Sequence, residues 1–174
     1  MRLAAATRTH VGTLAALMAA SPLLRRYGIT LRRARASLND ALRNRDTIVV
    51  ALDGANALGL AWVVATRALD RSAYLRLLLV AEGRQSRGLG ALLLADAERR
   101  ARAAGSRHMV LLVTATNRRA RSFYVRQGYR YVGVLPGFAR PRIGEALYVK
   151  SWPTTRPSRA ARWKGSHSRR SALS

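Results

Sequence analysis

The chain has 174 residues, 49% of them hydrophobic, and no cysteine, so it can bury the core of one domain but cannot form disulfides or thiolate metal sites. Its 32 Lys and Arg residues outnumber 8 Asp and Glu, a formal net charge of +24, which argues against a paired-carboxylate site or a hard-metal cage. No apolar run approaches the roughly 20 residues that a membrane-spanning helix needs.

The N-terminal segment predicts a short strand followed by two helices. Apolar residues at helical spacing predict a first helix that ends near Ala20, where Ser21 and Pro22 stop it. The same stretch faintly resembles a signal peptide, but small residues are poorly placed for cleavage. The segment "LLRRYGIT" predicts a loop, and the apolar periodicity of residues 30–43 predicts the second helix.

Three strands follow. The β-branched run of residues 46–52 and the apolar run of residues 57–68 predict a hairpin, because Asp53 and Gly54 between them favour a turn. A second turn around residues 69–72 leads into an apolar strand at residues 74–80.

The second half alternates helices and strands. A helix is predicted to end near Ala104, before Gly105, and its apolar face should hold Leu89, Leu92, Leu93, Ala97 and Ala101. Residues 108–115 are apolar enough to predict a strand buried on both faces. Asn117 predicts the start of another helix, which runs to Gln127.

Two last strands complete the predicted domain, at residues 129–135 and 145–152, with a loop of Pro and Gly between them. The order of elements predicts an α/β (α+β mixed) fold with helices on both faces of a mixed sheet. From Pro153 onward the chain is rich in Ser, Arg and Pro and has no periodicity. We therefore expect a domain at residues 1–151 and a basic, disordered tail at residues 152–174.

The loop after residues 74–80, "EGRQSRGLG", presents backbone N–H groups at the positive end of a helix, which predicts an anion site. Gly88 and Gly90 let a ligand approach the backbone, and Arg87 adds positive charge. A Walker loop needs Lys and Ser/Thr after its last Gly, and a dinucleotide fingerprint needs a third Gly where Leu93 stands. The pattern Gln/Arg-x-x-Gly-x-Gly/Ala, beginning at Gln85, matches at every fixed position.

This loop resembles the acetyl-CoA pyrophosphate loop of the GNAT superfamily of N-acetyltransferases. A second motif has the spacing of bacterial members similar to ribosomal-protein acetyltransferases: Asn117 is followed by Phe123-Tyr124 and Gly128-Tyr129. The resemblance covers most of residues 1 to 151. It implies a mixed, mostly antiparallel sheet of six to seven strands with about four helices on both faces, splayed between the fourth and fifth strands.

The resemblance implies a transfer of an acetyl group from acetyl-CoA to a primary amine of a small molecule or peptide, by direct attack in a ternary complex. Strand backbone should pair with the pantetheine arm, and loop N–H groups should hold the pyrophosphate. The residues that the resemblance implies for acetyl-CoA are Leu78, Leu79, Val80, Gln85, Ser86, Arg87, Gly88, Leu89, Gly90, Ala91 and Asn117.

For catalysis, the resemblance implies that Tyr124 is the general acid, because a phenol with a pKa near ~10 is protonated at neutral pH and can donate to a thiolate. The alternative is that Tyr124 only forms an aromatic helix face with Phe123. An N–H group near Val80 is the expected oxyanion donor. Where related enzymes often carry a basic Glu, this chain has Leu112, so deprotonation goes through water or through Glu82, which is alternatively a solvated charge.

The acceptor pocket is implied to include Arg25, Tyr27, Trp62, Tyr74 and Arg76. So many cations suit an acceptor with a carboxylate or phosphate, or are surface arginines of an Arg-rich protein. The three histidines lack the spacing of metal ligands, so no metal is expected.

An alternative function is that of a nucleic-acid-binding basic protein with an inactive or secondary acetyltransferase fold. Disordered basic tails bind phosphate backbones without sequence specificity. We expect a cytoplasmic protein with no membrane partner, a monomer or homodimer, whose contact with nucleic acid would be non-specific and through the tail.

Overall fold

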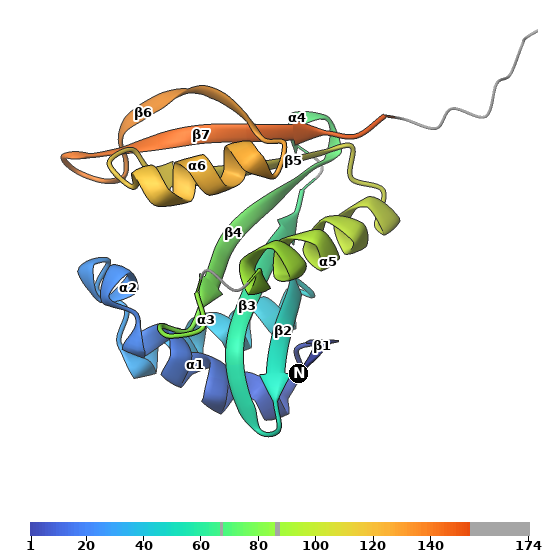
Figure 1. The fold of residues 1–174 in the computed structure, drawn as a ribbon, viewed down its shortest axis with the longest axis vertical. Helices are drawn as coiled ribbons and strands as arrows, with labels where there is room; N and C mark the ends of the chain where they lie inside the picture. The colour runs from blue at the N-terminus through green and yellow to red at the C-terminus, as the bar shows by residue number, and fades with distance from the viewer. Residues whose placement is uncertain (67, 86–87, 154–174) are drawn as a thin grey trace, which may run out of the picture.

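A seven-stranded sheet with helices on both faces forms the protein, as the computed structural model shows for residues 1–66, 68–85 and 88–153 (Figure 1). The strands are β1 (Arg2–Ala5), β2 (Thr47–Asp53), β3 (Asn56–Ala65), β4 (Ser72–Val80), β5 (His108–Thr114), β6 (Arg130–Arg140) and β7 (Ile143–Ser151). The helices are η1 (Arg8–His10, a 3-10 helix), α1 (Val11–Ala20), α2 (Pro22–Arg26), α3 (Leu31–Arg43), α4 (Ala68–Arg71), α5 (Leu89–Ala103) and α6 (Arg118–Arg126).

The strand order is β1-β2-β3-β4-β5-β7-β6, and only the β4–β5 pair is parallel. This parallel pair is short: residues 72–75 of β4 pair with residues 108–111 of β5. Beyond that point β4 continues to Val80 and β5 to Thr114 without pairing with each other. The expected mixed sheet, splayed between its fourth and fifth strands, is therefore confirmed, and the split divides it into two half-sheets (Figure 1).

A bulge in β4 determines which of its side chains lie on each face of the sheet beside the split. Val63 of β3 pairs with Leu75, whereas Trp62 pairs with Leu77, so Arg76 has no partner on β3. An extra residue in one strand reverses the alternation of side chains after it. As a result Leu78, three residues after Leu75, packs in the same core cluster, on the α5 face.

The core on this face lies between α5, α6 and the sheet. The buried residues of α5 are Leu89, Leu93, Leu94, Ala97 and Ala101. The prediction for Leu92 was wrong: it is 48% exposed, and Leu94 takes its place in the core. The approach of α5 to the sheet is close at Gly59, where a Cβ atom would lie 2.7 Å from the Leu79 carbonyl oxygen and 2.8 Å from the Leu93 side chain.

The opposite face of β2 and β3 carries α1 and α3. Their buried residues pack with the sheet in a second cluster that includes Leu14, Met18, Leu38, Val50 and Leu60. This cluster ends at β4, so the same face of β5 has less cover. The predicted burial of β5 on both faces was wrong for that reason: Met109, Leu111 and Val113 are buried, but the residues between them are only half-buried.

Two other segments differ from expectation. The predicted loop after Ser21 contains the short helix α2, with Pro22 in its first turn and the Ser21 hydroxyl accepting a hydrogen bond from the Leu24 N–H. Ser followed by Pro starts a helix as readily as it ends one. The loop predicted around Pro136 is instead part of β6, which runs to Arg140. This strand lies at the outer edge of the sheet, where proline, which has no backbone N–H, is tolerated.

No helix in the described part of the chain is long and apolar enough to cross a membrane.

Candidate active site

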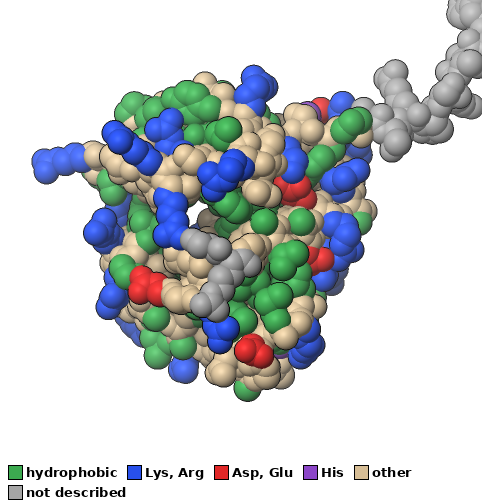
Figure 2. Space-filling view, in the orientation of Figure 1, with side chains coloured by type: hydrophobic (Ala, Val, Ile, Leu, Met, Phe, Trp, Pro, Cys, Tyr) green, Lys and Arg blue, Asp and Glu red, His purple; other side chains and the backbone are tan. Residues whose placement is uncertain are grey.

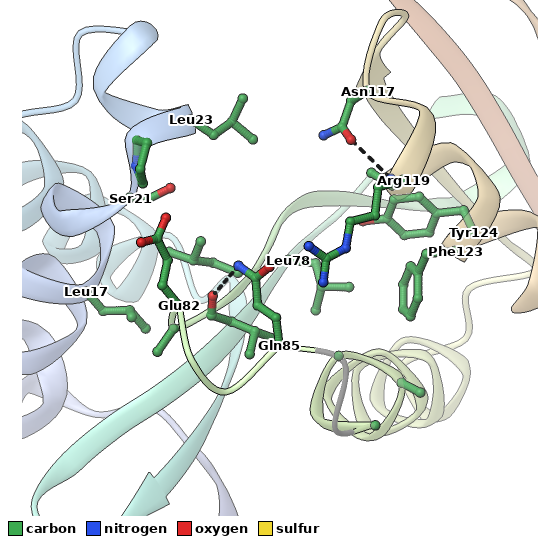
Figure 3. Close-up of a pocket in the computed structure, with 18 of the residues that line it drawn as sticks. Leu17, Ser21, Leu23, Leu78, Glu82, Gln85, Asn117, Arg119, Phe123 and Tyr124 are labelled. Carbon is green, nitrogen blue, oxygen red and sulfur yellow. Dashed lines mark hydrogen bonds between the residues drawn. The ribbon is translucent and has the colours of Figure 1, made fainter.

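A cavity of about 770 Å³ lies beside the free end of β4 (Figure 3). Its walls come from the end of α1 and the start of α2, from the β4–α5 loop and the first turn of α5, and from α6. The described residues from the predicted acetyl-CoA set that line it are Leu78, Leu79, Val80, Gln85, Gly88, Gly90, Ala91 and Asn117. Leu89 is buried in the core instead, and Ser86 and Arg87 lie outside the described residues.

The free edge of β4 supplies one wall. Leu78, Leu79 and Val80 pair with β3 on one side. On the other side no strand of the described part of the chain pairs with them, because β5 diverges after Leu111. Backbone polar groups need partners, and here the Val80 carbonyl accepts a hydrogen bond from Gln85 Nε2 at 3.3 Å. This edge can therefore pair with an extended ligand.

The first turn of α5 supplies the second wall. Gly88 is the N-cap residue, has φ of 78°, and provides no side-chain cap for the N–H groups of the first turn. A Cβ atom at Gly88 would meet nothing within 4 Å, so the backbone there is open to the cavity. Uncapped N–H groups at the positive end of a helix suit an anionic group such as a pyrophosphate.

The third wall is α6. The Asn117 side chain caps this helix by accepting a hydrogen bond from the Ala120 N–H at 3.1 Å. Arg119 projects from its first turn into the cavity (Figure 3), and the sequence analysis did not single it out. The available signal was its position in the first turn of α6, two residues after the Asn117 N-cap.

Tyr124 lies on the cavity side of α6 and is only 8% exposed. Its ring packs edge-on against Phe123 and Tyr129, with centroids 5.1 and 5.6 Å away. Burial raises the pKa of Tyr124 well above its ordinary value, and the nearby Tyr74 phenol raises it further. The hydroxyl consequently holds its proton at neutral pH, as a general acid must.

Glu82 also lines the cavity, but it is exposed. Figure 3 shows it on the side of Ser21 and Leu17, with Tyr124 and Phe123 on the side of α6. Its predicted role as a base stays a prediction.

None of the five residues predicted for the acceptor lines this cavity, and four of them form two separate pairs. Trp62 is 5% exposed and donates from Nε1 to Asp46 at 2.8 Å, with the Arg76 guanidinium 4.9 Å above its ring. Tyr27 and Tyr74 form the other pair, near Glu145. Burial raises the pKa of both phenols, and the charge of Glu145 raises it further. Arg25 is exposed on α2. Glu145 is a buried acid that the sequence analysis missed.

Buried tyrosines predict a loss of stability at high pH. Burial raises the pKa of both Tyr124 and Tyr129, and the Glu98 carboxylate adds to the effect at Tyr129. Above pH about 10 the unfolded chain loses these protons while the folded chain keeps them, so the free energy of unfolding should fall by about 1.4 kcal/mol per pH unit for each tyrosine. Below pH about 10 the contribution is fully present.

Denaturant titrations followed by circular dichroism between pH 8 and 11.5 measure this loss. The Tyr129→Phe variant, which removes one of the two phenols, should show a shallower decline than the wild type. An unfolding free energy that stays level to pH 11.5 would contradict the prediction.

Within the described residues no group of His, Cys, Asp or Glu could hold a metal ion.

Comparison with known families gives one match: the Acetyltransferase (GNAT) family model covers residues 16–129. No curated protein matches the chain significantly. The chain is similar in fold to many solved structures. Ribosomal-protein-alanine N-acetyltransferase from Brucella melitensis is 18% identical, with a TM-score of 0.73 over 87% of this chain and 100% of that one.

Two other solved structures were determined with a ligand. An aminoglycoside 6'-N-acetyltransferase complexed with coenzyme A is 16% identical, with a TM-score of 0.74 over 87% of this chain and 97% of that one. A Salmonella typhimurium protein solved with its cofactor acetyl-CoA is 15% identical, with a TM-score of 0.70 over 87% of this chain and 93% of that one. At these identities the likeness concerns the fold.

Proposed function

The chain belongs to the acetyltransferase (GNAT) family, whose cosubstrate is acetyl-CoA, and from that premise we propose that it transfers an acetyl group to a primary amine of a small molecule or peptide. The observation that carries the proposal is the position of Tyr124. A protonated phenol lies in the same cavity as the free β4 edge and the uncapped N-terminus of α5. The cavity therefore combines backbone groups that can bind an extended, phosphate-bearing thioester with a phenol that can donate a proton to its sulfur.

The described residues fit acetyl-CoA in three ways. The edge of β4 at Leu78 to Val80 suits the pantetheine arm, because its amides can pair as an added strand would. The open backbone at Gly88 suits the pyrophosphate. Arg119 brings a guanidinium to the cavity for a phosphate oxygen.

The bound thioester supplies an activated acetyl group. The protein would orient the thioester along β4 and offer a backbone N–H near Val80 to the carbonyl oxygen as negative charge develops there. Tyr124 would keep a proton for the departing sulfur. Tyr124 can do so at neutral pH because burial keeps its pKa raised.

Calorimetry with acetyl-CoA tests the first part of the proposal, and we expect saturable 1:1 binding. A thiol-release assay with acetyl-CoA and a panel of amines, peptides and aminoglycosides tests the second. Absence of binding heat under conditions where the folded state is verified would refute the proposal.

The rival function, nucleic-acid binding, is favoured only by the charge. Figure 2 shows Lys and Arg side chains scattered over the visible face, without a continuous patch. Scattered cations support weak, salt-sensitive contact with phosphate rather than a specific site. A gel shift at moderate salt with the full chain and with residues 1–151 separates the two functions, and a shift that needs residues 152–174 would assign nucleic-acid binding to the tail.

A further inference from the structure

Glu145 is the one acid that is fully buried among the described residues, with 4% of its surface exposed. It lies on β7, where the neighbouring Ala146 and Tyr148 pack into the core on the α5 and α6 face. Because side chains alternate along a strand, Glu145 points to the opposite face of the sheet. In a chain with 8 acids and 32 bases, the burial of a carboxylate needs an explanation.

The side-chain hydrogen bond of Glu145 comes from a neutral group. The Tyr27 hydroxyl donates to its Oε1 atom at 3.0 Å, and the same hydroxyl lies 2.5 Å from Thr114 Oγ1. No Lys, Arg or His forms an ion pair with it among residues 1–66, 68–85 and 88–153. The carboxylate of Glu98, by comparison, pairs with Lys150 at 2.7 Å and accepts from Tyr129.

A buried charge without an opposite charge is costly, and proteins ordinarily pair it. A hydrogen bond from the Tyr27 hydroxyl, which is itself hydrogen-bonded to Thr114, holds the carboxylate in place without neutralising it. The charges of Arg140 and Arg76 reach Tyr27 and Tyr74, but within the described residues neither guanidinium forms an ion pair with Glu145. The carboxylate is therefore left to pair with a cationic ligand.

The location of Glu145 connects it with the split in the sheet. It pairs with Thr114 at the end of β5, three residues beyond the last contact of β5 with β4. Tyr74 lies on the same face, since its neighbours Ala73 and Leu75 are in the core on the other face. The charge of Glu145 raises the pKa of Tyr74, and Tyr74 in turn raises that of Tyr124, so the three groups lie within electrostatic reach of one another across the split.

The face of the sheet around Glu145 has less cover than the same face of the other half-sheet. Its neighbours Leu112 and Thr114 on β5 and Leu147 on β7 are only half-buried, because α1 and α3 cover the other half-sheet. Tyr27, at the end of the short helix α2, is held over this face by its hydrogen bonds and by Arg140, which donates to its carbonyl oxygen.

We propose that Glu145, oriented by Tyr27 and Thr114, binds a positively charged nitrogen of the acceptor, so that the acceptor is a cationic amine and enters from the face of the sheet opposite α6. This inference rests on the proposed acetyltransferase function and deepens it. It favours a cationic acceptor over the acceptor with a carboxylate or phosphate that the arginine-rich surroundings suggested, and it leaves those arginines as surface residues.

The test compares Glu145→Gln with wild type, using 1,6-diaminohexane and spermidine as cationic probes and glutamate as the anionic one. Calorimetry in the presence of coenzyme A should show the two polyamines binding to wild type and at least about ten-fold more weakly to Glu145→Gln, since a charge-assisted hydrogen bond becomes a neutral one. In thiol release, kcat/KM for the amine should fall by the same factor. The Kd for acetyl-CoA should not change.

Stability separates a ligand-binding role from a structural one. Glutamine keeps the shape and can still accept from Tyr27 but removes an unpaired buried charge, so Glu145→Gln should unfold at the same or a higher denaturant concentration than wild type. The control, Glu98→Gln, loses its pair with Lys150 and should be less stable, while its affinity for the amines is that of wild type.

Equal amine affinity in wild type and Glu145→Gln would overturn the inference, and so would tighter binding of glutamate than of either polyamine, or no amine binding to wild type at all. None of these outcomes touches the proposed function, whose failure is read from acetyl-CoA binding and from thiol release with the wider panel.

Discussion

Replacing Tyr124 with phenylalanine should lower kcat for acetyl transfer by about 100-fold or more while the Kd for acetyl-CoA changes less than about three-fold. Loss of a general acid ordinarily costs a factor of this size. The ring of Tyr124 packs against Phe123 and Tyr129, and phenylalanine keeps that packing. The substitution therefore removes the proton donor and leaves the aromatic ring in place.

Steady-state thiol release gives kcat, and calorimetry gives the Kd. Tyr131→Phe is the matched control, because Tyr131 is 45% exposed on β6 and does not line the cavity; it should behave as wild type. If Tyr124→Phe kept the wild-type kcat, Tyr124 would be only part of the aromatic face of α6.

Replacing Gly88 with glutamate should weaken acetyl-CoA binding by at least about 100-fold. The substitution places a carboxylate at the open N-cap of α5, where an anionic pyrophosphate is expected, and like charges repel most strongly where water is excluded. The φ of 78° at this position adds strain for any residue with a Cβ atom. Calorimetry with acetyl-CoA measures the loss.

Gly54→Glu controls for strain and charge. Gly54 also has a positive φ, of 57°, and open space around its Cβ position, but it lies in the turn between β2 and β3 and not in the cavity. It should bind acetyl-CoA as wild type does. Wild-type affinity in Gly88→Glu, with the fold verified by circular dichroism, would place the pyrophosphate elsewhere.

Local signals predicted most of the fold. The periodicity of α1 and α3, the Asn117 cap of α6 and the hairpin of β2 and β3 are each encoded in one contiguous stretch of sequence, and the structure has them. The face of α5 was harder, because three consecutive leucines at 92–94 satisfy more than one helical face. Only the contact with β3, where Gly59 admits Leu93, selects the buried pair.

The same distinction, between features encoded locally and features set by distant contacts, applies to the candidate site. The β4–α5 loop is a contiguous motif, so Gln85, Gly88 and Gly90 could be named before the cavity was known. Glu145 could not be, because its environment comes from Tyr27, 118 residues away, and from Thr114 on the neighbouring strand. Nor does the sequence show that a bulge at Arg76 changes the face of every later side chain in β4.

The split between β4 and β5 also affects how the protein avoids association. An open sheet has two edges, and exposed edges invite pairing with other chains. Here the split creates two further edges, at the ends of β4 and β5, and both face each other across the inside of the fold. The edge of β4 lines a cavity of about 770 Å³, a space that suits a single extended ligand rather than another sheet. The protein thus keeps an unpaired strand edge permanently available to a ligand and shields it from the aggregation that such an edge would cause at the surface.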